Sequence, residues 1–280
     1  MDSENALPAA SQPEPDERKP SQVSVPGAMP KVPEGLQTAA MDVLNMLPVG
    51  QPATDVPEGL QTLAALNQLM IQQAVDLLEV ISFWECKNKY RITNTDKEQV
   101  YFAIEESSAF SRMCCGTNRG FVLHIQDNQK REVLSIVREF RCCTGCCWFA
   151  DGCCQYPMIV NDSAGRKLGM VRQMKSWYRK RFGIFDEHDV LLYEMWAPWC
   201  PCQRVCCRGD IIIPICNIKD KSQIGDIRKI WSGIVQEGFT TADAFKVSFP
   251  MDLLVTHKAL MLASVFLIDF TLFEDRDKKA

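Results

Sequence analysis

The run KALMLASVFLIDFTLF, at residues 258–273, decides how the rest of the chain has to fold. It contains no Gly or Pro and is apolar nearly all round, from Lys258 through Leu262 and Phe266 to Phe273, which predicts a helix buried in protein or in a membrane. Its sixteen residues would reach about 24 Å, short of the roughly 30 Å hydrocarbon core of a bilayer. Asp269 would also be costly at that depth. Both facts favour a helix buried in protein, for instance inside a closed barrel; the alternative is a single membrane anchor.

Upstream of this helix, short strand-like segments alternate with polar turns. The turns are rich in Asn, Asp, Gly and Lys, which is the chemistry that tight hairpins require. We expect an antiparallel sheet of roughly ten to twelve strands, and a sheet of that size usually curls or closes and so removes its edges. The expected turns are residues 94–97, 127–130, 161–165, 186–189 and 219–222.

The first 57 residues differ in composition from the rest. They hold most of the fifteen prolines, and residues 1–50 carry a net charge of −4, so we predict a disordered tail over residues 1–57 ahead of a domain at residues 58–280. The step from Pro30 to Pro33 is a candidate ligand for a polyproline-binding module, although a plain linker explains it as well. VPEGLQT occurs twice, at residues 32–38 and 56–62, and the second copy leads into a periodic apolar pattern that predicts an amphipathic helix up to Ile81.

Paired cysteines are the densest chemical feature. The N-terminus has no secretory signal, so we expect a reducing compartment and no disulfide framework for the fourteen cysteines. Three interpretations stay open: S-palmitoylation beside Trp148 and Phe149, buried thiols, or a zinc site, since Cys143-x₂-Cys146 has ligand-like spacing. The expected acylation sites are Cys142, Cys143, Cys146, Cys147, Cys153 and Cys154.

Composition and motifs exclude several classes of function. The net charge of −4 gives no basic excess for nucleic acid. The sequence contains no Gly-rich phosphate-binding loop, GxSxG or HExxH motif, so we expect neither ATP coupling nor covalent catalysis.

Five stretches together resemble the phospholipid scramblase family over residues 58–274: GLQTLAALNQLMIQQAVDLLE (59–79), NKYRITNTDKEQVYFAIEES (88–107), RMCCGTNRGFVLHIQDN (112–128), RCCTGCC (141–147) and the run from IWSG to TLFE (230–274). The resemblance implies a mainly β, tubby-like fold, a twelve-stranded barrel around the hydrophobic C-terminal helix. It also implies palmitoylation of the cysteine-rich run and attachment to the cytosolic face of the plasma membrane. A single-pass helix at residues 258–273 is the alternative means of attachment.

The resemblance further implies a Ca²⁺ loop at residues 241–252, TADAFKVSFPMD. As an EF-hand-like loop it is poor, because Lys246 stands where a Gly is wanted, and it predicts weak binding, with a Kd of about 10⁻⁴–10⁻³ M. The alternative is a strand with Phe245, Val247 and Phe249 facing inward. The implied ligand positions are Thr241, Asp243, Phe245, Val247, Phe249 and Asp252.

By resemblance, the function expected is Ca²⁺-stimulated, ATP-independent movement of phospholipids in both directions across the bilayer. A single short helix offers no polar path for headgroups, so such activity would call for oligomers or a thinned bilayer. The alternative is a palmitoylated, membrane-tethered adaptor without scrambling activity. A buried helix at residues 258–273 would favour the adaptor, and a lipid-exposed helix would favour scrambling.

Overall fold

The computed structural model describes residues 56–73, 86–107, 119–141, 150, 154–155, 157–199, 209–230 and 244–273. Residues 1–55, which include nearly all of the Pro-rich segment and both prolines of the PxxP step, lie outside this part of the chain. The prediction of a disordered tail therefore stays a prediction.

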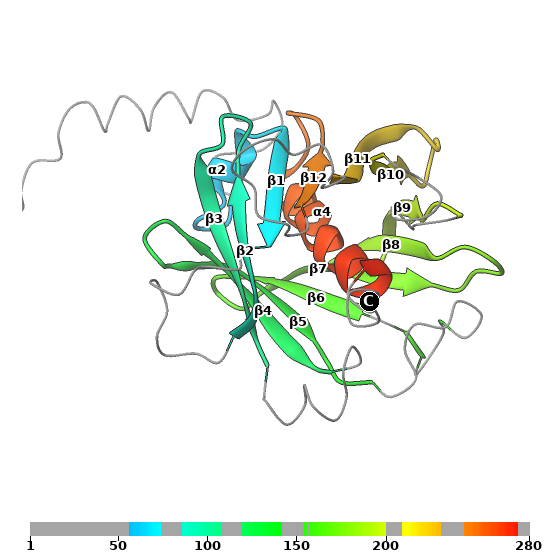
Figure 1. The fold of residues 1–280 in the computed structure, drawn as a ribbon, viewed down its shortest axis with the longest axis horizontal. Helices are drawn as coiled ribbons and strands as arrows, with labels where there is room; N and C mark the ends of the chain where they lie inside the picture. The colour runs from blue at the N-terminus through cyan, green and yellow to red at the C-terminus, as the bar shows by residue number, and fades with distance from the viewer. Residues whose placement is uncertain are drawn as a thin grey trace, which may run out of the picture.

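The described residues form a closed barrel of antiparallel strands, which confirms the expected fold class (Figure 1). Neighbours in sequence are neighbours in the barrel, and β1 closes it by pairing with both β12 and β2. Closure leaves no unpaired sheet edge. The strands are β1 (Gln68–Gln73), β2 (Cys86–Thr93), β3 (Gln99–Glu106), β4 (Phe121–Asp127), β5 (Glu132–Arg138), β6 (Pro157–Asp162), β7 (Lys167–Met174), β8 (Arg181–Asp186), β9 (Leu191–Trp196), β10 (Ile211–Asn217), β11 (Gln223–Ile230) and β12 (Ala244–Ser248).

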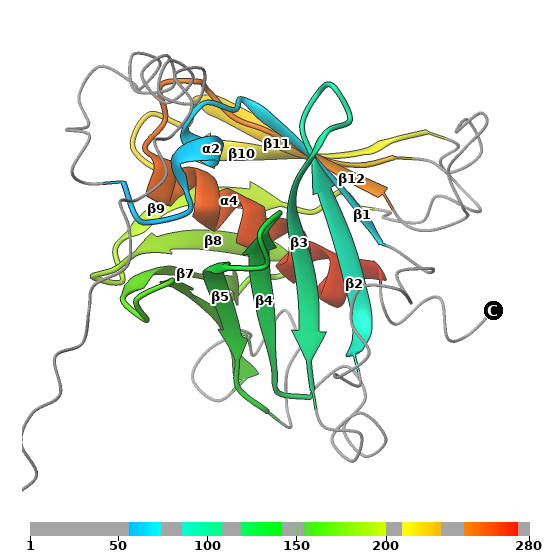
Figure 2. The same ribbon diagram turned by 90° about the vertical axis from the view of Figure 1, so that its left-hand side faces the viewer.

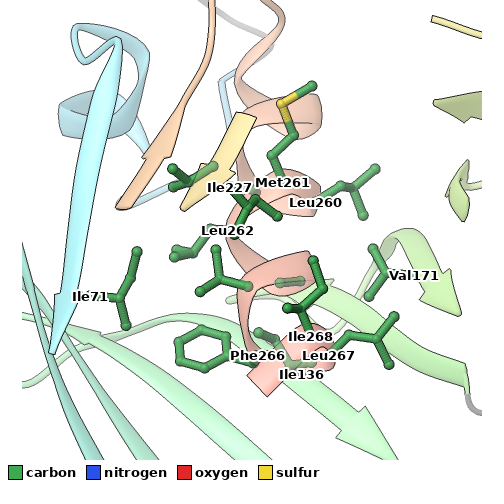
Figure 3. Close-up of a cluster of buried hydrophobic side chains, with 14 of the residues drawn as sticks. Ile71, Ile136, Val171, Ile227, Leu260, Met261, Leu262, Phe266, Leu267 and Ile268 are labelled. Carbon is green, nitrogen blue, oxygen red and sulfur yellow. The ribbon is translucent and has the colours of Figure 1, made fainter. Parts of the chain in front are cut away.

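The C-terminal helix runs through the middle of this barrel (Figure 2). It consists of α4 (Val255–Ile268) and a π-helical turn, η5 (Asp269–Phe273). Inward side chains of strands from around the barrel, such as Ile71, Ile136 and Ile227, converge on helix residues including Phe266 (Figure 3). The expectation of a helix buried in protein is confirmed, and the all-round apolarity of the run follows because strands surround it.

The predicted hairpin turns are all found, and four of them share one local design. Each begins with an Asn or Asp whose side-chain oxygen accepts the backbone N–H groups two and four residues later, at 2.8–2.9 Å. The residue three positions on then takes a positive φ, between 63° and 78°. These turns begin at Asn94, Asp127, Asp162 and Asp186, with Lys97, Lys130, Gly165 and Asp189 in the left-handed region.

The predicted amphipathic helix is wrong over residues 65–73. Within the described residues 56–73, helical structure is confined to α2 (Gln61–Ala64), and three residues separate it from β1. Leu69 and Ile71 point into the core with the period of two of a strand. Hydrogen bonding to β2 and β12 on both sides outweighs the helical spacing of the leucines, because that spacing is only a weak prior against tertiary pairing. Residues 74–81 lie outside the described part of the chain.

Strand order gives the barrel two chemically different ends. The tight turns and the first residues of α4 lie at one end, called here the hairpin end. The longer connections that follow β1, β3, β5, β7, β9 and β11 emerge at the opposite end, called here the loop end, where η5 also finishes. Contacts agree with this assignment, because Lys180 after β7 donates a hydrogen bond to the Thr271 carbonyl at 2.5 Å.

Candidate membrane-contacting site

The loop end is where the topology gathers the chemistry singled out in the sequence. Arg141 and Ala150, at that end, flank the run that contains Cys142, Cys143, Cys146 and Cys147. Those four cysteines and Cys153 lie outside the described residues, whereas Cys154 is described and half-buried. The connection after β9 likewise leads from Trp199 into a second cysteine cluster, which comprises Cys200, Cys202, Cys206 and Cys207 and lies outside the described residues. Palmitoylation, a buried-thiol role and a zinc role thus remain predictions.

An exposed group of rings stands on the described part of the loop end. Trp177 and Tyr178 belong to the β7–β8 connection, and Trp199 follows β9; their exposed fractions are 79%, 66% and 72%. The rings of Tyr178 and Trp199 stack at 4.8 Å with an interplanar angle of 6°. Because β8 lies between β7 and β9, the two connections are neighbours. We call these three residues the aromatic patch.

Cations border the aromatic patch. The guanidinium of Arg179 lies over the rings of Trp196 and Trp199, at 5.2 and 5.7 Å from their centroids. Arg181 also faces Trp196, at 5.3 Å, and forms an ion pair with Glu194 at 2.6 Å. Such cation–π contacts hold the rings and the guanidinium in a fixed mutual arrangement. This end of the barrel therefore presents a pre-ordered aromatic and basic surface.

Beneath the loop end, a buried polar cluster ties the strands together beside η5. Arg119 donates two hydrogen bonds to Glu105, at 2.8 and 2.9 Å, and Asn88 donates a third at 2.6 Å. Burial by itself raises the pKa of the Glu105 carboxyl, but the bonds and charge of Arg119 outweigh it, so that pKa lies below its usual range. The Arg119 guanidinium also lies 5.7 Å from the Phe270 ring. Gln73 and Ser107 extend this cluster by donating hydrogen bonds to Asn88 and Glu105, so its polar groups serve to hold the strands together.

The two charged residues of the core helix are both satisfied inside the barrel. Lys258 is fully buried and donates to the carbonyls of Ala64, Leu66 and Met251, at 2.7, 2.7 and 2.9 Å. Asp269 accepts a hydrogen bond from the Tyr90 hydroxyl at 2.8 Å. Leu262, Phe266 and Phe273 lie in the apolar core.

The implied calcium positions are spread along the barrel. Thr241 and Asp243 lie outside the described residues. Phe245, Val247 and Phe249 are buried, as the strand interpretation of this stretch predicted. Asp252 is exposed at the hairpin end, beyond the strand that separates it from Thr241. Within the described ranges, no group of three or more His, Cys, Asp or Glu side chains could hold a metal ion.

The core helix also passes a test for membrane spans. In the described part of the chain, Val255–Phe273 is the one helix long and apolar enough to cross a bilayer, but 83% of its most apolar stretch is buried inside the barrel. The core helix of a soluble barrel passes the same test, so length and composition do not make it a span.

Comparison with known proteins decides the family. The Scramblase family model matches residues 46–275, most of the chain. The chain belongs to the Scramblase family. Among its relatives, phospholipid scramblase 1 of Homo sapiens is 38% identical over 230 residues, covering 81% of this chain and 70% of that protein. Phospholipid scramblase 2 of Bos taurus is 38% identical over 230 residues, covering 81% and 75%. Phospholipid scramblase family member 5 of Homo sapiens is 37% identical over 223 residues, covering 80% of each.

The match to the family model confirms the resemblance noted in the sequence at the level of the family. No solved structure matches this scramblase-family chain.

Sequence reasoning missed the aromatic patch, although a signal for it was present. The segment KSWYRKR, residues 175–181, places two aromatic residues among four cations between two predicted strands. Aromatic side chains in such a short polar connection are not needed to fill the core.

Proposed function

We propose that this scramblase-family protein moves phospholipids in both directions between bilayer leaflets, without ATP and stimulated by Ca²⁺. The observation that carries the proposal is the family match over residues 46–275, together with relatives named phospholipid scramblases. The family also suggests lipid transport rather than covalent catalysis. The absence of a Gly-rich phosphate loop from the sequence supports independence from ATP.

In this proposal the protein lies at the cytosolic face of the plasma membrane and carries acyl chains on cysteines between Cys142 and Cys154. Two or more acyl chains give stable attachment, because one alone binds a membrane only marginally. The flanking residues Arg141 and Ala150 lie at the loop end, so acyl chains there would reach a bilayer facing that end. Weak Ca²⁺ binding is proposed at Asp243 and at Asp252, each by itself, because β12 separates the two positions in the chain. Headgroup passage is proposed to use oligomers or local thinning of the bilayer.

A second function is favoured by one specific observation. The core helix is buried in the barrel and not presented to lipid, which is the arrangement expected of a membrane-tethered adaptor. In this alternative the palmitoylated barrel binds partners without moving lipid, and Pro30 and Pro33 recruit a polyproline-binding module.

A dithionite assay separates these two functions. Proteoliposomes that contain the purified full chain and a fluorescent phospholipid are quenched from outside, with and without Ca²⁺ and with and without ATP. Scrambling is expected to let dithionite quench more than the half of the fluorescence that lies in the outer leaflet. This additional quenching should require Ca²⁺ and should be the same with and without ATP. Quenching that stops at the outer-leaflet half in every condition overturns the scrambling proposal and leaves the adaptor.

Variants of the same assay test the calcium positions. Asp243→Ala/Asp252→Ala is expected to lose the Ca²⁺ response. Asp96→Ala/Glu187→Ala, which removes two exposed acids from hairpin turns, is the matched control and is expected to keep it. An unchanged Ca²⁺ response in the first variant would exclude these carboxylates as the source of stimulation.

A further inference from the structure

We infer that the aromatic patch and the basic segment of residues 175–181 form a docking surface for a bilayer that contains anionic phospholipid. This inference rests on the proposed membrane function and specifies which surface of the barrel meets the lipid. The ligand is the headgroup region, where phosphates and carbonyls meet the first methylene groups.

The rings have the chemistry of an interfacial anchor. Trp177, Tyr178 and Trp199 are each between 66% and 79% exposed, and neighbouring exposed apolar side chains often mark an interaction site. Trp and Tyr combine an apolar body with a polar N–H or O–H, and they are enriched at the level of lipid headgroups for this reason. The stacked pair of Tyr178 and Trp199 is already ordered, so binding would cost little side-chain entropy.

The charges favour an anionic bilayer over a neutral one. Residues 175–181 carry four cations and no acid: Lys175, Arg179, Lys180 and Arg181. Arg181 is paired with Glu194 and Lys180 donates to the Thr271 carbonyl, so Lys175 and Arg179 are the cations that we assign to the lipid. Basic segments of this kind are attracted by the negative surface potential of membranes with anionic lipids. The guanidinium of Arg179 lies 5.2 and 5.7 Å from the ring centroids of Trp196 and Trp199, and a guanidinium is the side-chain group best suited to bind phosphate oxygens.

The surface is attached rigidly and points the right way. Lys180 is held by the Thr271 carbonyl, and the Ala197 N–H donates to the Lys180 carbonyl at 2.9 Å. The patch therefore has a fixed direction relative to the core helix, next to the ends of β7 and β9 and the start of β8. It also shares the loop end with the connections that lead into the cysteine clusters. Acyl chains and rings would thus enter the same bilayer.

Vesicle flotation of the full chain tests the inference. Protein purified from bacteria carries no acyl chains, so flotation reports the surface alone. Wild type is expected to float with vesicles of phosphatidylcholine and phosphatidylserine, and less with phosphatidylcholine alone. Trp177→Ser/Tyr178→Ser/Trp199→Ser is expected to lower the partition coefficient about tenfold or more. Lys175→Gln/Arg179→Gln is expected to lose the preference for phosphatidylserine.

The matched control is Val190→Ser/Met251→Ser, which removes exposed apolar side chains from the hairpin end. It is expected to float as wild type does, and all variants must keep the wild-type circular dichroism and unfolding temperature. Equal flotation of wild type and the triple variant overturns the inference, as does an equal loss in the control. The first of these results would point instead to a protein partner for the rings.

Failure of the inference can be told apart from failure of the proposed function. Patch-dependent flotation of a wild-type protein that moves no lipid in the dithionite assay would overturn scrambling and support the docking surface. Lipid movement by a wild-type protein whose flotation does not depend on the patch would overturn the docking surface alone.

Discussion

Single residues set the hairpins through backbone chemistry that needs no distant partner. An Asn or Asp at the start of each shared turn satisfies two N–H groups, and a residue with positive φ completes it. At one of these turns, Gly165 takes φ +78°, and an added Cβ would meet nothing within 4 Å. The Gly is therefore favoured by the backbone angle and not by space, although Lys or Asp takes this position in the other three turns.

Gly165→Ala is expected to lower the free energy of unfolding by about 1 kcal/mol, because a Cβ is strained in the left-handed region. Gly165→Asn should cost clearly less, since Asn tolerates that region. Urea unfolding of both variants measures the difference. Identical midpoints for the Ala variant and wild type would show that the turn relaxes.

The Glu105–Arg119 pair predicts sensitivity to acid. Because the pKa of Glu105 is depressed in the fold, its contribution is fully present above the ordinary carboxyl pKa and is lost as pH falls through the lower folded value. Glu105→Gln, which leaves Arg119 buried without its counter-charge, should cost about 3–5 kcal/mol at neutral pH.

Thermal unfolding between about pH 6 and pH 3 checks this linkage. Glu105→Gln/Arg119→Met removes both charges and is expected to lose the part of the acid sensitivity that belongs to the pair. If the double variant follows the pH dependence of wild type, other carboxylates cause the acid sensitivity.

At the scale of elements, the core helix packs against the barrel along its length, and a buried polar contact holds it to the barrel at each end. Gly169 on β7 allows the close approach, because a Cβ there would lie 2.3 Å from the Phe185 carbonyl oxygen and 3.0 Å from the Leu260 side chain. Lys258 fastens the first turn of α4 to the segment before β1, and Asp269 fastens η5 to β2. Each charge is thus buried with polar partners, as burial requires.

Lys258 predicts an unusual alkaline dependence. Burial lowers its pKa to about 8, partly offset by the charge of Asp252. Between about pH 8 and pH 10 the unfolded chain then binds more protons at this site than the folded one, so the stability contributed by this residue rises with pH. Relative to Lys258→Met, wild type should gain free energy of unfolding across this window. A constant difference between the two proteins would show that Lys258 stays charged in the fold.

At the scale of the whole molecule, β1, from the start of the domain, closes the barrel that the later strands form. Ile71 on β1 is fully buried and is paired with Ile92 on β2 and Phe245 on β12. Closure joins segments that are far apart in the sequence, as in the pairing of Gln68 with Ser248. It also sorts the connections into two ends, which is what gives the loop end its rings, cations and cysteine-bearing segments.

Ile71→Asp is expected to destabilise the protein by more than about 4 kcal/mol, because it buries an unpaired charge at the closing strand. Gln72→Asp, on the neighbouring half-exposed position, is the control and should cost far less. Near-ultraviolet circular dichroism and urea unfolding measure both variants. Similar midpoints for the two would mean that β1 is dispensable for closure.

The sequence alone determined the features that depend on local chemistry. Turn residues specified the hairpins, and a run without a polar face specified a buried helix, with its short length and Asp269 favouring burial in protein. The family resemblance implied twelve strands and carried the expectation of lipid movement. The inward positions of Phe245, Val247 and Phe249 followed from simple alternation along a strand.

Only the tertiary structure decided the rest, because the deciding forces act between distant segments. The leucine spacing after Leu60 predicts a helix, yet hydrogen bonds to β12 make residues 68–73 a strand. Trp199 and Tyr178 are ordinary aromatic residues in the sequence, and their stacking exists because β8 sets two connections side by side. Local sequence patterns indicate which helices and strands can form. Strand pairing and closure of the barrel decide which of their side chains reach the surface together.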